Sequence, residues 1–144
     1  MRLVKMYADG CRDIGEFLFE FSQLEFSIRV LLHARIRLAE EYFDLVISPY
    51  DFAALCNVSR EVLLKQLPAK AATIKDVFAQ CLALNENRVR IAHGLWTYGA
   101  DSLVARVVSR GSLQMKYYFE KSGELRELAQ KAQMLNQAVL TIGR

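Results

Sequence analysis

The residues best suited to chemistry lie together in the segment Asn85–Trp96, which contains Arg88, His93 and the only tryptophan of the chain. Histidine can accept or donate a proton near neutral pH, and a guanidinium can hold a phosphate through paired hydrogen bonds. These two groups could cleave RNA without a metal ion, because the ribose 2′-hydroxyl supplies the nucleophile. The alternative is a structural role, with His93 at a helix C-terminus that the helix dipole favours.

Length and composition are those of one globular domain spanning residues 1–144, without a linker or repeat. The formal net charge of +3 permits an anionic partner without requiring one. The chain has no apolar run of about twenty residues, so no membrane partner is expected. The polar residues Asp9 and Arg12 argue against a secretory signal. Three scattered cysteines favour a reducing compartment, and we therefore expect a cytoplasmic protein.

Cofactor binding has little support in the sequence. The two histidines are distant from each other and no two cysteines are close, so no set of metal ligands is predicted. No glycine-rich phosphate loop is present, which argues against a nucleotide cofactor. We expect neither a metal nor another cofactor.

Long helices are expected because only two prolines and seven glycines interrupt the chain. Between about Cys11 and Asp44, apolar residues recur at steps of three and four, the period of one helix face. Ser48 is predicted to cap a second helix with Pro49 in its first turn, and this helix continues to about Leu67 and is ended by Pro68.

A third helix is predicted from about Ala69 to near Gly94. Residues 103–108 and 113–119 alternate between the two faces of a strand, and the turn residues 110–112 separate them, which predicts a β-hairpin. Ser122 is expected to cap a last helix. The predicted fold is all-α: an antiparallel bundle of about four helices with a small β-hairpin inserted before the last one.

Polar residues interrupt the apolar stripes of two predicted helices. Asn85 and Arg88 occupy stripe positions on the third helix, and Glu25 and Arg35 do so on the first. A bundle core does not accept an unpaired charge without a large cost in free energy. We therefore predict that Glu25 faces Arg88, either as a structural ion pair or as the carboxylate that holds a catalytic arginine in place.

The spacing of the chemical residues sets a geometric condition. His93 follows Arg88 by five residues, which on an ideal helix places it about 140° around the axis. Arg90 lies nearer to the azimuth of His93. Arg88 and His93 can converge only if Arg88 reaches around the helix, if the helix unwinds at Gly94, or if a second copy of the helix supplies the missing half in a two-fold dimer.

The segment Asn87–Trp96 resembles the R-x4-6-H signature of the HEPN superfamily. Its second half, Ile91-Ala92-His93-Gly94 followed by Trp96, is similar to the form "R-N-x-I-A-H-G-x-W" found in many members. The predicted layout, with the motif on the third helix and a hairpin and terminal helix after it, resembles members associated with abortive infection and toxin systems. The layout covers nearly the whole chain, whereas the motif covers about ten residues.

The resemblance implies that Arg88 and His93 are the catalytic pair of a metal-independent endoribonuclease whose homodimer brings two motifs into one cleft. It also implies a toxin or defence effector, with an antitoxin protein as a further partner. Val89 departs from the pattern, because active members usually have Asn, Asp or His there. Asn87 or Arg90 could supply the polar group; alternatively, the chain is an inactive HEPN-like module that binds RNA or a partner protein.

The chemistry that the resemblance implies is transphosphorylation. His93 would act as general base on the ribose 2′-hydroxyl or as general acid toward the leaving 5′-oxygen. Arg88 would stabilise the charge that develops on the phosphorus centre. The products would be a 2′,3′-cyclic phosphate and a 5′-hydroxyl, and single-stranded RNA is the expected substrate.

The predicted hairpin supplies candidate RNA-binding residues. Arg106, Arg110 and Lys116 lie in the stretch 102–119, which contains no acidic residue. They could contact a phosphate backbone, while Tyr117 and Tyr118 could stack on bases. The alternative is a solvated face of the hairpin with no ligand.

Overall fold

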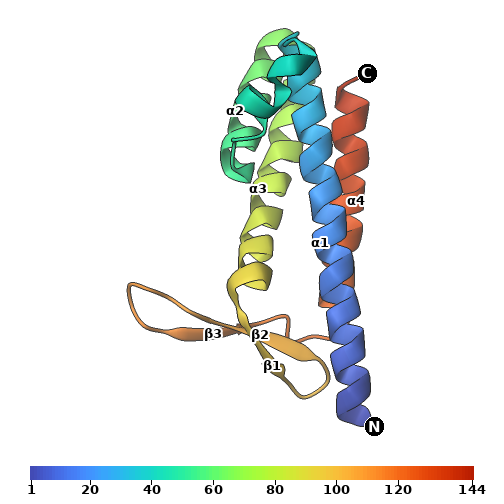
Figure 1. The fold of residues 1–144 in the computed structure, drawn as a ribbon, viewed down its shortest axis with the longest axis vertical. Coiled ribbons are helices and arrows are strands. Elements are labelled where there is room, and N and C mark those ends of the chain that lie inside the picture. The colour runs from blue at the N-terminus through green and yellow to red at the C-terminus, as the bar shows by residue number, and fades with distance from the viewer.

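One 34-residue helix, α1 (Arg2–Arg35), runs along nearly the whole molecule in the computed structural model, which describes residues 1–144 (Figure 1). It begins and ends about nine residues earlier than the predicted range Cys11–Asp44. The helix stops because Arg37 adopts a left-handed conformation with φ of 53°. The apolar period continues past that break, in the 3₁₀ turn η1 (Glu40–Tyr42) and the π-helical turn η2 (Phe43–Ile47).

Helix α2 (Phe52–Gln66) and helix α3 (Ala71–His93) form the second layer of the bundle and are joined by the 3₁₀ turn η3 (Pro68–Lys70). The prediction that Pro68 terminates α2 is confirmed. The predicted cap at Ser48 is wrong, because Asp51 caps α2: its Oδ1 accepts a hydrogen bond of 2.7 Å from the backbone N–H of Ala54.

Three antiparallel strands follow α3 in the order β1 (Leu95–Tyr98), β2 (Leu103–Val108) and β3 (Met115–Tyr118). The predicted hairpin corresponds to β2 and β3, and Val107 is paired with Lys116. Strand β1, which was not predicted, pairs with β2 directly after Gly94 ends α3. Its residues Leu-Trp-Thr-Tyr favour a strand, but the run is too short to show a period.

The sheet packs against the N-terminal half of α1, beyond the C-terminal end of α3 (Figure 1). Gly10 permits this contact, because a Cβ atom there would lie 2.5 Å from Cδ1 of Leu103. The close packing of the sheet against α1 therefore uses a glycine in the first third of the helix.

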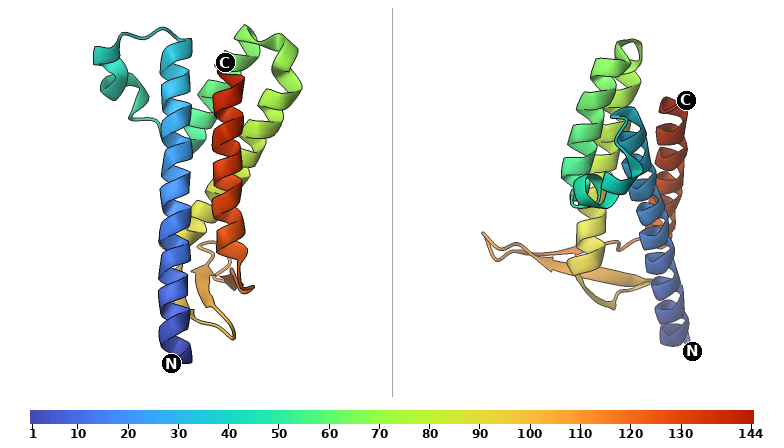
Figure 2. Two further views of the ribbon diagram at one scale, coloured as in Figure 1. Left: turned by 90° about the vertical axis from the view of Figure 1, so that its right-hand side faces the viewer. Right: turned by 45° about the horizontal axis from the view of Figure 1, so that its top comes forward.

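Helix α4 (Glu124–Ile142) lies along α1, as both views in Figure 2 show. Gly123, with φ of 85°, precedes it in place of the predicted Ser122 cap. The molecule is thus mostly helical with a small sheet, and η2 makes a fifth helix where about four were predicted. None of the helices has the length and apolar character that crossing a membrane requires. One core joins 25 buried residues of the bundle and sheet, among them Phe17, Leu24, Ile28, Leu55, Phe78 and Val139.

Asp51→Ala is expected to destabilise the fold by about 1 kcal/mol, because one N–H in the first turn of α2 loses its acceptor. Asp51→Asn should retain most of that stability, since its side-chain oxygen still accepts the bond. Urea unfolding followed by circular dichroism measures both variants. Equal losses for alanine and asparagine would contradict the capping role.

Candidate active site

Arg88 lies in the last turns of α3 and turns its side chain toward α1. The side chain is half-buried, its Nε donates a hydrogen bond of 3.1 Å to Oδ1 of Asn85, and its guanidinium carbon lies 5.4 Å from the centre of the Phe21 ring. The guanidinium forms no salt bridge. Its terminal NH2 groups donate to no group of the chain, so they remain available to an anion.

The predicted pairing of Glu25 with Arg88 is wrong. Glu25 instead accepts a 2.7 Å bond from Arg29, four residues later on the same helix. Arg29 also donates to the carbonyl oxygens of Ile47 (2.7 Å) and Tyr50 (2.8 Å), so it fastens the η2 segment to α1. Glu25 therefore supports this connection and does not orient Arg88. Glu25 and Arg29 are four residues apart, which is the spacing of a common helix ion pair. This spacing could have predicted their contact.

His93 is the last residue of α3, and its side chain is exposed. The helix stays regular up to this point: the N–H of Gly94 still donates a 2.8 Å bond to the carbonyl of Arg90. The helix therefore does not unwind, and the separation of about 140° between His93 and Arg88 is retained. The two side chains do not meet within one chain, which leaves the two-fold dimer as the arrangement that could join them.

Arg90 and Asn87 form a second polar pair in the last turns of α3. Nη1 of Arg90 donates to Oδ1 of Asn87 at 3.5 Å, and its guanidinium lies 4.4 Å from the centre of the Tyr118 ring. A cation at this distance over an aromatic face is stabilised by the ring electrons. This contact joins α3 to β3. Tyr118 was a candidate for base stacking, but its ring already contacts the guanidinium of Arg90.

Trp96 ties β1 to the end of α3. Its indole N–H donates a 3.1 Å bond to the carbonyl of Ile91, and its ring stacks on Phe119 with centroids 5.7 Å apart. Carbonyls in the last turn of a helix have no partner within the helix, so this bond satisfies one of them. The side chain therefore fixes the direction in which the chain leaves His93.

Trp96→Phe is expected to destabilise the protein by about 1–2 kcal/mol, because the backbone carbonyl of Ile91 loses its hydrogen-bond donor while the aromatic stack with Phe119 remains. Trp96→Ala should cost more, since it also leaves a cavity. Chemical denaturation followed by circular dichroism measures both. A phenylalanine variant as stable as the wild type would contradict a stabilising role for this hydrogen bond.

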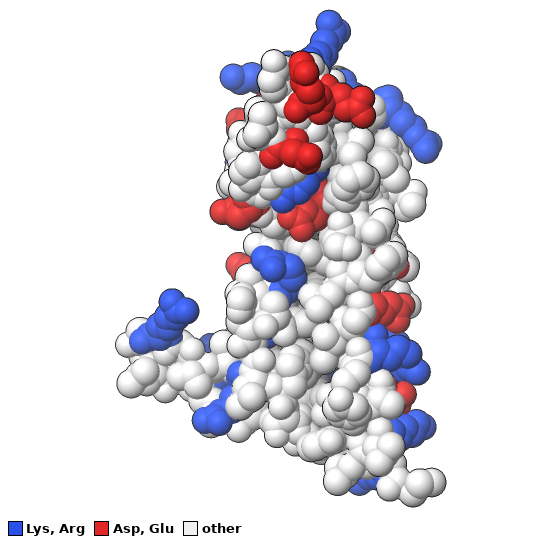
Figure 3. Space-filling view, in the orientation of Figure 1, with Lys and Arg blue, Asp and Glu red and all other residues white.

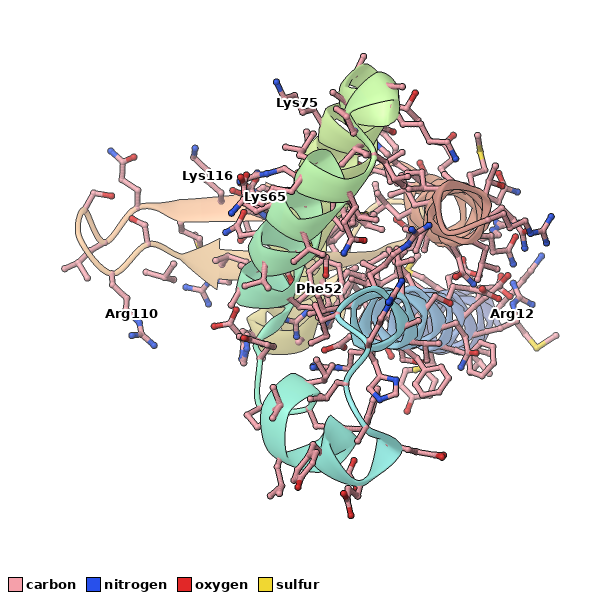
Figure 4. The ribbon with its side chains drawn as sticks, turned by 90° about the horizontal axis from the view of Figure 1, so that it is seen from above. Arg12, Phe52, Lys65, Lys75, Arg110 and Lys116 are labelled. Atoms are coloured by element: carbon pink, nitrogen blue, oxygen red, sulfur yellow. The ribbon has the colours of Figure 1, made fainter.

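The basic residues of the hairpin are all exposed, but they do not share one face. Arg106 is paired with Tyr117 across the strands and donates to the sulfur of Met115, whereas Lys116 stands beside Val107 on the opposite face. Arg110 lies in the turn, and Figure 4 shows it pointing away from Lys116. A single phosphate backbone cannot contact all three at once on one face of the hairpin.

The surface around the end of α3 is an open concavity. Figure 3 shows a hollow on this side of the molecule, between the upper part of the bundle and the projecting hairpin. Neither Arg88 nor His93 lines any of the five main surface pockets. A pocket of about 800 Å³ instead lies at the other end of the bundle, where Arg35, Arg37 and Gln66 line it.

The buried thiol of Cys56 is not a second reactive centre. A hydrogen bond with Cys81 and burial raise the pKa of Cys56 far above that of a free thiol. Because the thiolate is the nucleophile and the metal ligand, Cys56 is inert at neutral pH. No group of three or more His, Cys, Asp or Glu side chains is arranged to hold a metal ion.

The hydrogen bond between Arg88 and Asn85 could be predicted from the sequence, because residues three apart are neighbours on a helix. The contact with Phe21 could not, since it depends on how α1 crosses α3.

No protein-family model, no curated protein and no solved structure matches this chain.

Proposed function

We propose that the protein is a metal-independent endoribonuclease of the HEPN type, with Arg88 and His93 as its catalytic pair. The observation that carries the proposal is the state of Arg88. Its guanidinium is half-buried and positioned by Asn85 and Phe21, yet no carboxylate neutralises it. A positioned and unpaired guanidinium is suited to hold a phosphate and to stabilise added negative charge on it.

The reaction transfers the phosphorus from the 5′-oxygen of one nucleotide to the 2′-oxygen of the one before it. A base removes the proton of the 2′-hydroxyl, the 2′-oxygen attacks the phosphorus, and the bond to the 5′-oxygen breaks. His93 serves as that base or as the acid that protonates the leaving oxygen, since its imidazole is exposed to substrate. The products are a 2′,3′-cyclic phosphate and a 5′-hydroxyl.

The active form is a homodimer in this proposal. Arg88 and His93 point in different directions from a regular helix, so Arg88 of one copy acts with His93 of the other. The open concavity beside α3 accommodates single-stranded RNA, which bends more easily than a duplex. The proposed role is a toxin or defence effector in the cytoplasm, restrained by an antitoxin protein.

A second candidate is a catalytically inactive HEPN-like module that binds RNA or a protein. Two observations favour it: Val89, where active members carry a polar residue, has a 41% exposed side chain, and the guanidinium of Arg90 is held over the ring of Tyr118. In this case Arg88 would bind a phosphate without cleaving the chain.

Cleavage of labelled single-stranded RNA in the presence of EDTA distinguishes the candidates. The nuclease yields fragments with 2′,3′-cyclic phosphate ends, which His93→Ala and Arg88→Ala do not produce. RNA that stays intact but is bound more weakly by Arg88→Ala than by the wild type identifies the binding module.

A further inference from the structure

The side of α1 that points away from the bundle carries an uncharged stripe. We call these seven positions the outer face of α1, and all of them are exposed: Val4, Ala8, Cys11, Gly15, Phe19, Ser22 and Phe26. Phe19 is 60% exposed and Phe26 58%. The left view of Figure 2 shows α1 with no other element in front of it. An exposed apolar stripe of this length is typical of an interaction surface.

Gly15 lies at the middle of this face and has no role within the chain. A Cβ atom added there would meet nothing within 4 Å, whereas at Gly10 it would collide with Leu103. Glycine in a helix interior lowers helix stability relative to alanine. A close approach by another backbone gives a physical reason for its presence, because only glycine leaves room for such an approach.

We propose that the outer face of α1 binds the same face of a second copy, antiparallel, with the two-fold axis at Gly15. Successive positions of the outer face are separated by 4, 3, 4, 4, 3 and 4 residues, so their spacing is symmetric about Gly15. In this pairing, residue i lies opposite residue 30 − i. Phe19 meets Cys11 and Phe26 meets Val4, so each large ring lies against a smaller side chain, as interdigitating helices require.

Charge complementarity favours the antiparallel orientation. Arg12 and Glu16 lie along the same edge of the outer face, and Figure 4 shows Arg12 pointing away from the bundle. Arg12 contacts Asp9 (3.2 Å) and Asp13 (3.6 Å) of its own chain, whereas Glu16 forms no salt bridge. Antiparallel helices bring this edge against itself, so Arg12 of each copy lies within reach of Glu16 of the other. A parallel pair would instead place Phe19 on Phe19 and leave Glu16 against uncharged residues. The paired stretch is about 33 Å long, or roughly three heptads, which suffices for a two-stranded contact.

This contact is separate from the candidate active site. Phe21, which Arg88 covers, follows Phe19 by two residues and so lies about 160° away around α1. Pairing through the outer face leaves the end of α3 free in each copy. A protein that also pairs around α3 would then assemble as a closed group of four copies when the two two-fold axes cross at right angles.

The first test is the mass in solution by light scattering. We expect an assembly of two or four chains for the wild type, and half that mass for Phe19→Glu at the same concentration. Met134→Glu is the matched control, because Met134 is a 72% exposed apolar residue on α4, outside the outer face. A monomeric wild type, or equal loss of mass in both variants, overturns the proposal whatever the nuclease assay shows.

The second test maps the register through cysteines. In a Cys11→Ser background, Gly15→Cys should cross-link across the axis with a short bismaleimide. Ala8→Cys, which would lie about 21 Å from its symmetry mate, should not cross-link by itself, but it should do so when mixed with Ser22→Cys. No cross-link at Gly15→Cys, or an efficient one at Ala8→Cys alone, overturns the antiparallel register.

A third variant separates packing from folding. Gly15→Leu removes a helix-destabilising residue and meets no atom of its own chain, so the variant should melt no lower than the wild type at a concentration where both are monomeric. Its dissociation constant should rise at least tenfold, because the side chain fills the space that the partner needs. An unchanged dissociation constant contradicts the proposal.

Discussion

Replacing His93 or Arg88 with alanine is expected to slow RNA cleavage by about 10²–10⁴-fold while the protein stays folded. His93 is exposed and Arg88 makes a single hydrogen bond within the chain, so neither truncation opens a cavity in the core. The loss comes from the transition state, where a proton transfer or the stabilisation of developing charge disappears. Initial rates on labelled RNA in EDTA, with melting curves for each variant, measure the effect.

Two arginine controls sharpen this result. Arg88→Lys keeps the charge but loses the fork that binds two phosphate oxygens, so it should recover only part of the activity. Arg90→Ala removes a neighbouring arginine that is held by Tyr118 and should retain most of the activity. A larger loss for Arg90→Ala than for Arg88→Ala would reverse the assignment and place the phosphate site beside His93 on one chain.

Mixing the two inactive variants tests whether the site is shared between copies. A dimer of one Arg88→Ala chain and one His93→Ala chain contains one intact combination, Arg88 from the second and His93 from the first. Equal mixing with free exchange should restore about one quarter of the wild-type rate. A mixture as inactive as its components would show that each chain acts with its own pair of residues.

Arg29→Met is expected to destabilise the protein by about 2–4 kcal/mol and to lower Tm by roughly 5–15 °C. The side chain is only 14% exposed and donates to Glu25 and to the carbonyl oxygens of Ile47 and Tyr50. Methionine fills a similar volume but donates no hydrogen bond, so three acceptors lose their partner. Thermal and urea unfolding measure the change.

Arg110→Met is the matched control, because Arg110 is exposed in the hairpin turn and should change stability by less than about 0.5 kcal/mol. Glu25→Gln should cost less than Arg29→Met, since the two carbonyl bonds of Arg29 remain. If Glu25→Gln proved the more damaging of the two, the carboxylate and not the connection to η2 would be the important group.

Local sequence determined where most elements lie. Gly94 marks the end of α3, Pro68 the end of α2, and the alternation in residues 103–108 predicts strand β2 at its observed bounds. These features depend on neighbours along the chain: the missing N–H of proline, the freedom of glycine and the two-residue period of a strand. The separation of Arg88 and His93 around the helix follows from the same local geometry.

Only the tertiary structure decided which distant groups meet. The break in α1 at Arg37 was invisible because the apolar period continues through η1 and η2, which bury Ile47 in the same core. The partner of Glu25 could have been Arg29 or Arg88 by charge alone, and the path of the η2 segment selected Arg29 by supplying two carbonyl oxygens to it. Arg88 has no carboxylate partner as a result. The position of α1 places the ring of Phe21 against its guanidinium instead. Periodicity defines the faces of a helix, but the crossing of separate helices determines what each face contacts.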